Sequence, residues 1–258
     1  MILRRVTHHM KAQNWAAITV EFVLVVLGVF LGVAAANWNE QRLEKRETER
    51  LLQQVDDQLT ANLRYIDALS SYYGITGAYG DRAIAAWQGN PSVSDQEFVI
   101  AAYQASQITA YGNNANVFGA IFGAENLRDI DDPEIRQSLA IVMTYDYALV
   151  DLRAVSTRYR EEVRKTIPHS IQQAIRERCG DRQTVNGFAL PTSCDVNLPP
   201  VEAARTAADL RARPELLGEL HWHRAAVANQ IANAAVLASF IRPLTERIGD
   251  PADSTDQQ

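Results

Sequence analysis

The sequence predicts an all-α protein, with one N-terminal transmembrane helix followed by an extracytoplasmic helical bundle. Two observations predict the helices: the 258 residues include only 9 prolines and 13 glycines, and the runs between them are rich in Ala, Leu, Gln, Glu and Arg. The third observation is one long apolar run near the N-terminus. A hydrophobic content of 47% leaves enough apolar residues for a globular core beyond that run.

The apolar run covers residues 16–36, in which only Thr19 and Glu21 are polar. As a helix it would be roughly 31 Å long, which matches the hydrocarbon thickness of a bilayer. Trp15 and Trp38 flank the run, and their indole rings would lie at the two membrane borders. The transmembrane helix is therefore predicted over residues 15–38, with the lipid bilayer as its partner.

Two other interpretations of this run remain open. A buried core helix would need protein on every side, and a signal peptide would be cleaved after Ala36, behind a run of small residues. The anchor is preferred because the apolar run starts six residues before Phe22, which is long for a signal peptide. In addition, no turn-forming residue separates Ala36 from the helical pattern that follows.

The charges around the run bear on its orientation. Three cations precede the run and four follow it closely, so the positive-inside rule does not decide. The later cations alternate with glutamates, whereas the short N-terminal segment has no acidic residue. We therefore predict a cytoplasmic tail over residues 1–14, a helical extracytoplasmic domain over 39–249 and a disordered tail over 250–258. This makes the chain a single-pass membrane protein whose domain lies in an external, periplasm-like compartment.

The two cysteines support this compartment. Cys179 and Cys194 bracket a loop that contains glycine and proline, and a disulfide between them would require an oxidising environment. Two unrelated buried thiols are the alternative. Two cysteines without neighbouring histidines are too few for a zinc site, so no metal or other cofactor is predicted.

One face of the predicted transmembrane helix is small and polar. Glu21, Gly28, Gly32 and Asn39 recur at helical spacing along it. Gly28 and Gly32 form a small-xxx-small pattern, which allows two helix backbones to approach closely, and a carboxyl group on the same face can bond to a partner helix. The pattern predicts a homodimer. The alternative is that glycines are common in membrane helices and that Glu21 reaches toward the headgroups.

The same segment resembles a known family. The run from Glu21 to Val33, followed by Asn-Trp-Asn-Glu at 37–40, is similar to the N-terminus of a family of uncharacterised bacterial single-pass membrane proteins, and residues 127–139 resemble a second stretch of that family. The resemblance implies a retained anchor and an external helical domain, with no established activity. Residues 19–22 are also similar to pilin-like subunits, but the glycine typical of pilins is replaced by Ala16.

The rest of the chain reads as a series of helices. Residues 39–50 predict a charged stem, and a heptad-like pattern from Leu52 to Leu69 predicts a helix of the domain core or a short coiled coil. The further predicted elements are short pieces broken at Gly74, Gly77, Gly80, Gly89 and Asn90-Pro91, a helix capped by Ser94 and running to about Ala110, a long helix from Pro133 to near Pro168, the cysteine loop, and helices Val201–Arg213 and Pro214–Ile248.

No catalytic motif is present. His221 and His223 are two positions apart, which points their rings away from each other on a helix, and the adjacent pair Asp56-Asp57 diverges in the same way. A net charge of −6 argues against nucleic acid as a partner. All nine tyrosines lie between Tyr65 and Tyr159, where they would line a ligand pocket or simply fill core margins.

Two functional classes follow from these observations. The first is a membrane-anchored helical module that associates with itself and binds an unknown protein partner or signal outside the cytoplasm. The second is a structural subunit of a pilus-like or envelope assembly.

Overall fold

The computed structural model describes residues 15–109, 126–150 and 157–249. The chain divides into two compact units, Met1–Leu51 and Leu52–Gln258. Most described residues are helical, and a single antiparallel pair of short strands, β1 (Arg182–Thr184) and β2 (Gly187–Ala189), completes the secondary structure of these ranges. The predicted all-α class is confirmed, with the small hairpin as an addition. The predicted tails, 1–14 and 250–258, lie outside the described residues.

The first unit contains the start of helix α2 (Trp15–Trp87), which is helical through the whole predicted transmembrane segment. The apolar window of this helix has a mean hydropathy of 2.4, and none of it is buried. The helix is therefore long and apolar enough to cross a membrane. Its first described side chains start at Thr19, so the side chain of Trp15 lies outside the described part.

In the second unit, α2 is an amphipathic helix of the domain core. Val55, Leu59, Ile66 and Leu69 are each at most 3% exposed, at the helical spacing of the heptad-like pattern. These side chains pack inside the unit, which confirms the interpretation of this segment as a core helix.

The prediction that glycines break this helix into short pieces is wrong for Gly74, Gly77 and Gly80. All three lie inside α2, although each costs about 1 kcal/mol relative to alanine in a helix interior. Large side chains on the buried face of the same turns offset this cost, among them Tyr72 and Tyr79, which are nearly fully buried. Tertiary packing therefore outweighs local propensity here.

The helix ends instead at Trp87, through the predicted breakers Gly89 and Asn90. Gly89 has a φ of +82°, which glycine adopts without steric cost. Its N–H donates to the carbonyl of Ala86 at 3.1 Å, and that of Asn90 donates to Ala85 at 3.0 Å. This pair of bonds is a Schellman motif, which satisfies the last carbonyls of the helix.

Helix α3 (Asp95–Ala105) begins with the predicted capping box. The amide of Glu97 donates to the Ser94 hydroxyl at 3.2 Å, and the amide of Ser94 donates to the Glu97 carboxylate at 2.8 Å. The helix ends before the predicted Ala110, because the Ser106 hydroxyl donates to its own helix at Tyr103 and Arg160 binds the Ser106 carbonyl at 2.6 Å.

The predicted long helix from Pro133 to Pro168 is wrong in its middle. After η1 (Asn126–Asp129), α5 (Pro133–Thr144) starts with the predicted cap, in which Asp132 accepts from the amides of Glu134 and Ile135. Tyr145 is extended, and Asp146 then caps η2 (Tyr147–Val150) by accepting from the Ala148 amide. The chain thus leaves the α-helical path at Tyr145, and the next described α-helix is α6 (Arg158–Thr166).

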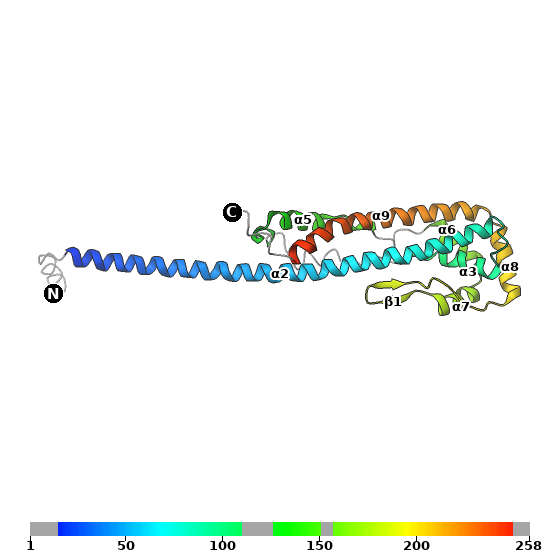
Figure 1. The fold of residues 1–258 in the computed structure, drawn as a ribbon, viewed down its shortest axis with the longest axis horizontal. Helices are drawn as coiled ribbons and strands as arrows, with labels where there is room; N and C mark the ends of the chain where they lie inside the picture. The colour runs from blue at the N-terminus through cyan, green and yellow to red at the C-terminus, as the bar shows by residue number, and fades with distance from the viewer. Residues whose placement is uncertain (1–14, 110–125, 151–156, 250–258) are drawn as a thin grey trace. The chain divides into compact units, whose positions relative to one another are not determined.

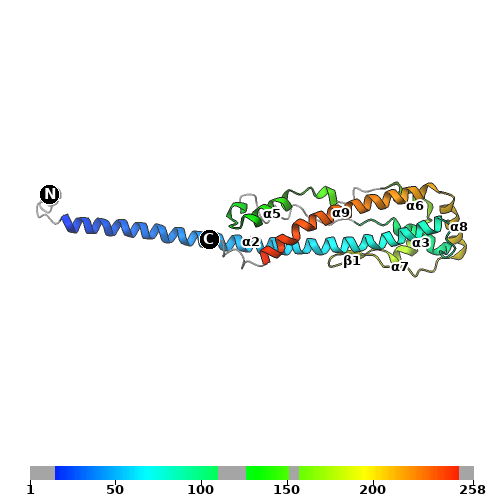
Figure 2. The same ribbon diagram turned by 45° about the horizontal axis from the view of Figure 1, so that its top comes forward.

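In the C-terminal half, the last two helices agree with the predicted pair, whereas the helix before the cysteine loop and the hairpin within that loop were not predicted. This half comprises α7 (His169–Cys179), the hairpin, α8 (Pro200–Arg211) and α9 (Glu215–Gly249). Figures 1 and 2 both show α9 alongside the part of α2 that belongs to the second unit, with α3, α6, α7 and α8 gathered near the C-terminal end of α2. The indole of Trp87 packs edge-on against Phe98 and donates to the Leu210 carbonyl at 3.1 Å, which joins α2, α3 and α8 in one core.

Candidate functional site

The predicted association face of α2 lies in the first unit. Glu21, Gly28, Gly32 and Asn39 fall on one stripe because the helix is continuous through all four positions. Side chains from 19 to 46 are exposed on every side of the helix, with Phe30 69% exposed. A Cβ added at Gly28 or Gly32 meets no atom within 4 Å. Nothing in the described chain covers this stripe, so it is open to lipid or to a partner helix.

The predicted membrane border at Trp38 has a cation beside it. The Trp38 side chain is 64% exposed, and the Arg42 guanidinium lies 5.6 Å from the centre of its ring. An indole next to an arginine one turn later suits the interface between headgroups and water, where amphipathic rings and cations are both favoured.

The second unit contains a pocket of about 370 Å³, open to solvent on one side. Its lining comes from three helices: residues of α2 between Ser70 and Gly77, Ala105 of α3, and residues of α9 between His223 and Ile231. Its volume lies within the roughly 300–1,000 Å³ that small-molecule sites occupy. Sequence reasoning missed this pocket, although the glycine spacing in α2 was visible.

His223 forms part of the inner wall and is 2% exposed. Its Nδ1 lies 2.6 Å from the Thr157 hydroxyl, and its ring lies 5.6 Å from that of Tyr159. Burial lowers the pKa of His223 to about 4, the charge of Arg160 acts in the same direction, and a hydrogen bond to the Ala105 backbone opposes both. The imidazole is therefore neutral at neutral pH.

Arg224, the next residue, spans from α9 to α2. Its Nη1 lies 2.7 Å from the Asp81 carboxylate, and its side chain crosses Gly80, where an added Cβ would come within 3.1 Å of the arginine Cδ. A side chain at position 80 would therefore press on Arg224, which would have to shift by a few tenths of an ångström. The ion pair leaves this side of the pocket without net charge.

Most of the described tyrosine hydroxyls form hydrogen bonds within the second unit. Tyr72 donates to Asp181 at 2.8 Å, Tyr159 donates to the Ala102 carbonyl at 2.9 Å, and Tyr73 both donates to and accepts from the backbone of Thr109. Burial raises the pKa of all three. Only Tyr73 of these lines the pocket, so the clustering in sequence reflects the core and its hydrogen bonds more than a ligand site.

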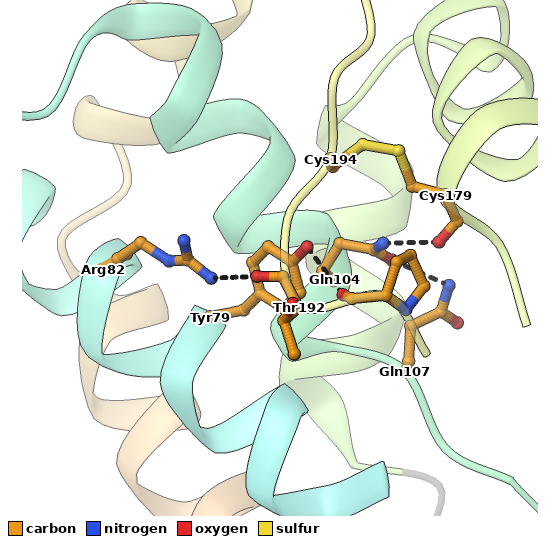
Figure 3. The surroundings of a disulfide bond; sticks show 8 residues. Tyr79, Arg82, Gln104, Gln107, Cys179, Thr192 and Cys194 are labelled. Carbon is orange, nitrogen blue, oxygen red and sulfur yellow. Dashed lines mark hydrogen bonds between the residues drawn. A yellow bond between two sulfur atoms is a disulfide. The ribbon is translucent and has the colours of Figure 1, made fainter. Parts of the chain in front are cut away.

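The predicted disulfide between Cys179 and Cys194 is confirmed. Figure 3 shows how the loop it closes is held against α2 and α3. The amide of the buried Gln104 donates to the Cys179 carbonyl at 2.7 Å, Tyr79 donates to the Pro191 carbonyl at 3.0 Å, and Arg82 donates to the Thr192 carbonyl at 3.3 Å. Side chains of two helices therefore satisfy three carbonyls at the two ends of the loop.

The other candidate groups for chemistry stay apart. His221 is exposed whereas His223 is buried, and within the described ranges no three His, Cys, Asp or Glu side chains converge as they would around a metal. Asp132, predicted as a helix cap, also pairs with Arg247 at 2.6 Å.

Comparison with models of protein families, with curated proteins and with solved structures finds no match for this chain.

Proposed function

We propose that the chain is a single-pass protein of a bacterial inner membrane, which self-associates through its spanning helix and presents a helical domain that binds a partner or signal in the periplasm. The observation that supports this most is the apolar window of α2, of which no part is buried. Its large side chains, such as Phe22 at 68% and Phe30 at 69% exposed, would each be worth about 2 kcal/mol on removal from water. Only lipid or another apolar helix provides that environment along the whole segment.

Retention of the segment is favoured over cleavage by the backbone at the candidate cleavage point. Residues 34–36 lie within the uninterrupted helix α2, whereas proteases cut most readily in exposed, irregular chain. The disulfide between Cys179 and Cys194 supports an oxidising compartment for the domain, which makes the N-terminus cytoplasmic. The resemblance of residues 21–40 to a family of anchored bacterial proteins agrees with this topology.

The anchor is tested by extraction of membranes at alkaline pH, followed by the mass of the intact protein. We expect the full chain to stay in the membrane fraction and a variant lacking residues 1–38 to be released. Protease added to spheroplasts should digest the domain, because it is exposed on the periplasmic side. A mature product that begins at Asn37 and is washed off by alkali would refute the proposal.

Self-association is tested on the small-residue stripe. Replacing Gly28 and Gly32 by isoleucine should weaken association at least tenfold, because two added side chains prevent close approach of the backbones. Resonance energy transfer between labelled copies in vesicles measures the effect. The control is Ala34→Ile, which places an isoleucine about 140° around the helix from the stripe.

Unchanged association of the Gly28→Ile/Gly32→Ile variant would eliminate this stripe as the interface. Crosslinking in intact cells distinguishes the two functional classes. A self-associating module gives a small discrete oligomer, whereas a subunit of a pilus-like assembly gives a long ladder of products.

A further inference from the structure

The pocket between α2, α3 and α9 is built around two glycines that the chain does not need for its own packing. Gly74 and Gly77 each cost about 1 kcal/mol relative to alanine in a helix interior, and a Cβ built at either position meets nothing within 4 Å. Gly80, in contrast, lies against the Arg224 side chain, whose Cδ an added Cβ would approach to 3.1 Å. The missing side chains at 74 and 77 leave space that belongs to the pocket.

The serine and threonine hydroxyls that line the pocket already donate hydrogen bonds to backbone carbonyls. Thr76 donates to the carbonyl of Tyr73 at 3.1 Å, and Ser70 donates to that of Ile66 at 3.0 Å. Each hydroxyl oxygen still has lone pairs to accept a hydrogen bond. Thr76 is only 6% exposed, so it lies in the interior of the pocket, whereas Ser70 lies at its rim. A molecule that bonds to these oxygens must supply the donor.

The charges at the pocket are compensated. Arg224 is paired with Asp81 at 2.7 Å, and His223 is neutral at neutral pH. The other lining residues among those described are alanine, glycine, valine, isoleucine, serine, threonine and tyrosine. A charged ligand would lose hydration here without a free opposite charge in return, and apolar walls of this kind favour an apolar ligand.

We propose that the pocket bounded by Thr76, Gly77 and Val227 binds a small, uncharged, mainly apolar molecule that carries a hydrogen-bond donor. The ligand's apolar body fills the space beside Gly74 and Gly77, and its donor bonds to the Thr76 hydroxyl oxygen. This deepens the proposed function by giving the signal a chemical class, and its role as a signal rests on that function. Binding itself does not depend on the topology of the anchor.

The test uses the full chain in lipid nanodiscs and 5-fluoroindole, an uncharged aromatic probe with one N–H donor. Fluorine relaxation of the probe is measured over a concentration series, with protein-free nanodiscs as the reference for partition into lipid. We expect saturable binding to the protein above that reference. 5-Fluorobenzofuran has nearly the same shape without the donor, and we expect it to bind about fivefold more weakly, the effect of one net hydrogen bond.

Variants locate the binding. Gly74→Leu/Gly77→Leu fills the pocket and should weaken 5-fluoroindole binding at least tenfold. The control is Gly218→Leu, an exposed glycine of α9 that also has open space around it, and it should bind as the wild type does. Thr76→Val should weaken 5-fluoroindole about fivefold and leave 5-fluorobenzofuran unchanged, because it removes the acceptor and keeps the shape.

Several results would overturn the proposal: no saturable binding beyond the empty nanodiscs, equal binding by the filled variant, or equal affinity for the indole and the benzofuran. Tighter binding of 5-fluoroindole-2-carboxylate would show that the site takes an anion instead. None of these results depends on alkaline extraction, so failure here and failure of the anchored topology are separate outcomes.

Discussion

Reduction of the Cys179–Cys194 disulfide is expected to lower the free energy of unfolding of the second unit by about 3 kcal/mol, the chain-entropy value for a closed loop of about 15 residues. For a domain of about 200 residues this corresponds to a fall in the melting temperature of about 6–12 °C. The folded loop is also held by hydrogen bonds from three side chains of α2 and α3 to its carbonyls, and these bonds are lost when the loop unfolds. Urea unfolding of the full chain in nanodiscs, with and without reductant, measures the change.

The control for this experiment is the variant Cys179→Ala/Cys194→Ala. It should unfold at the stability of the reduced wild type, and reductant should have no further effect on it. A second variant, Gln104→Ala, removes the bond to the Cys179 carbonyl and keeps the disulfide. Equal stability of oxidised and reduced wild type would show that the loop contributes nothing through its closure.

Acidification from pH 7.5 to pH 4 is expected to remove about 3 kcal/mol of stability through His223 alone. The ordinary pKa of histidine is 6.5, and in the fold that of His223 is lowered to about 4 by burial and by Arg160. The unfolded chain therefore binds a proton over a range in which the folded chain does not. The stability contributed by the neutral ring is present above pH 6.5, and it is lost as the pH falls from about 6.5 to about 4.

The measurement compares unfolding free energies of wild type and His223→Gln across this range. The difference between the two proteins should shrink by about 3 kcal/mol as the pH falls, because glutamine does not titrate. Carboxylates whose pKa values are lowered, such as Glu162 with a pKa of about 2, contribute equally to both proteins and cancel. His221→Gln, at an exposed position two residues away, serves as the matched control and should follow the wild type. Parallel curves for wild type and His223→Gln would contradict the assignment.

Local signals in the sequence predicted the helix ends well. Ser94 with Glu97, Asp132 with Pro133, and Gly89 with Asn90 act through bonds to neighbouring backbone groups, so a short stretch of sequence contains the whole cause. The apolar run at 16–36 is equally local, because its length and composition make it long and apolar enough to cross a bilayer.

The errors came from effects that act between distant residues. Gly74 and Gly77 look like breaks until the burial of their neighbours Tyr72 and Tyr79 is known. The long helix predicted after Pro133 fails beyond Thr144, where Asn233 of α9 binds the Leu149 carbonyl at 3.0 Å. The pocket could not be predicted either, since the segment of α9 that faces Gly77 lies about 150 positions later in the chain.

Helix α9 runs antiparallel to α2 within the second unit. Arg224 pairs with Asp81, and further along α9 Ile231 shares the pocket with Ser70, so α9 returns toward the beginning of the second unit. Helix α9 therefore ends near the end of the unit at which α2 enters it, and Figures 1 and 2 both show α9 running back along α2. Domains with neighbouring termini tolerate transplantation and circular permutation. A fusion partner attached behind Gly249 would join the second unit at the end where α2 enters it, and would leave the turns at Gly89 and Arg213 unobstructed.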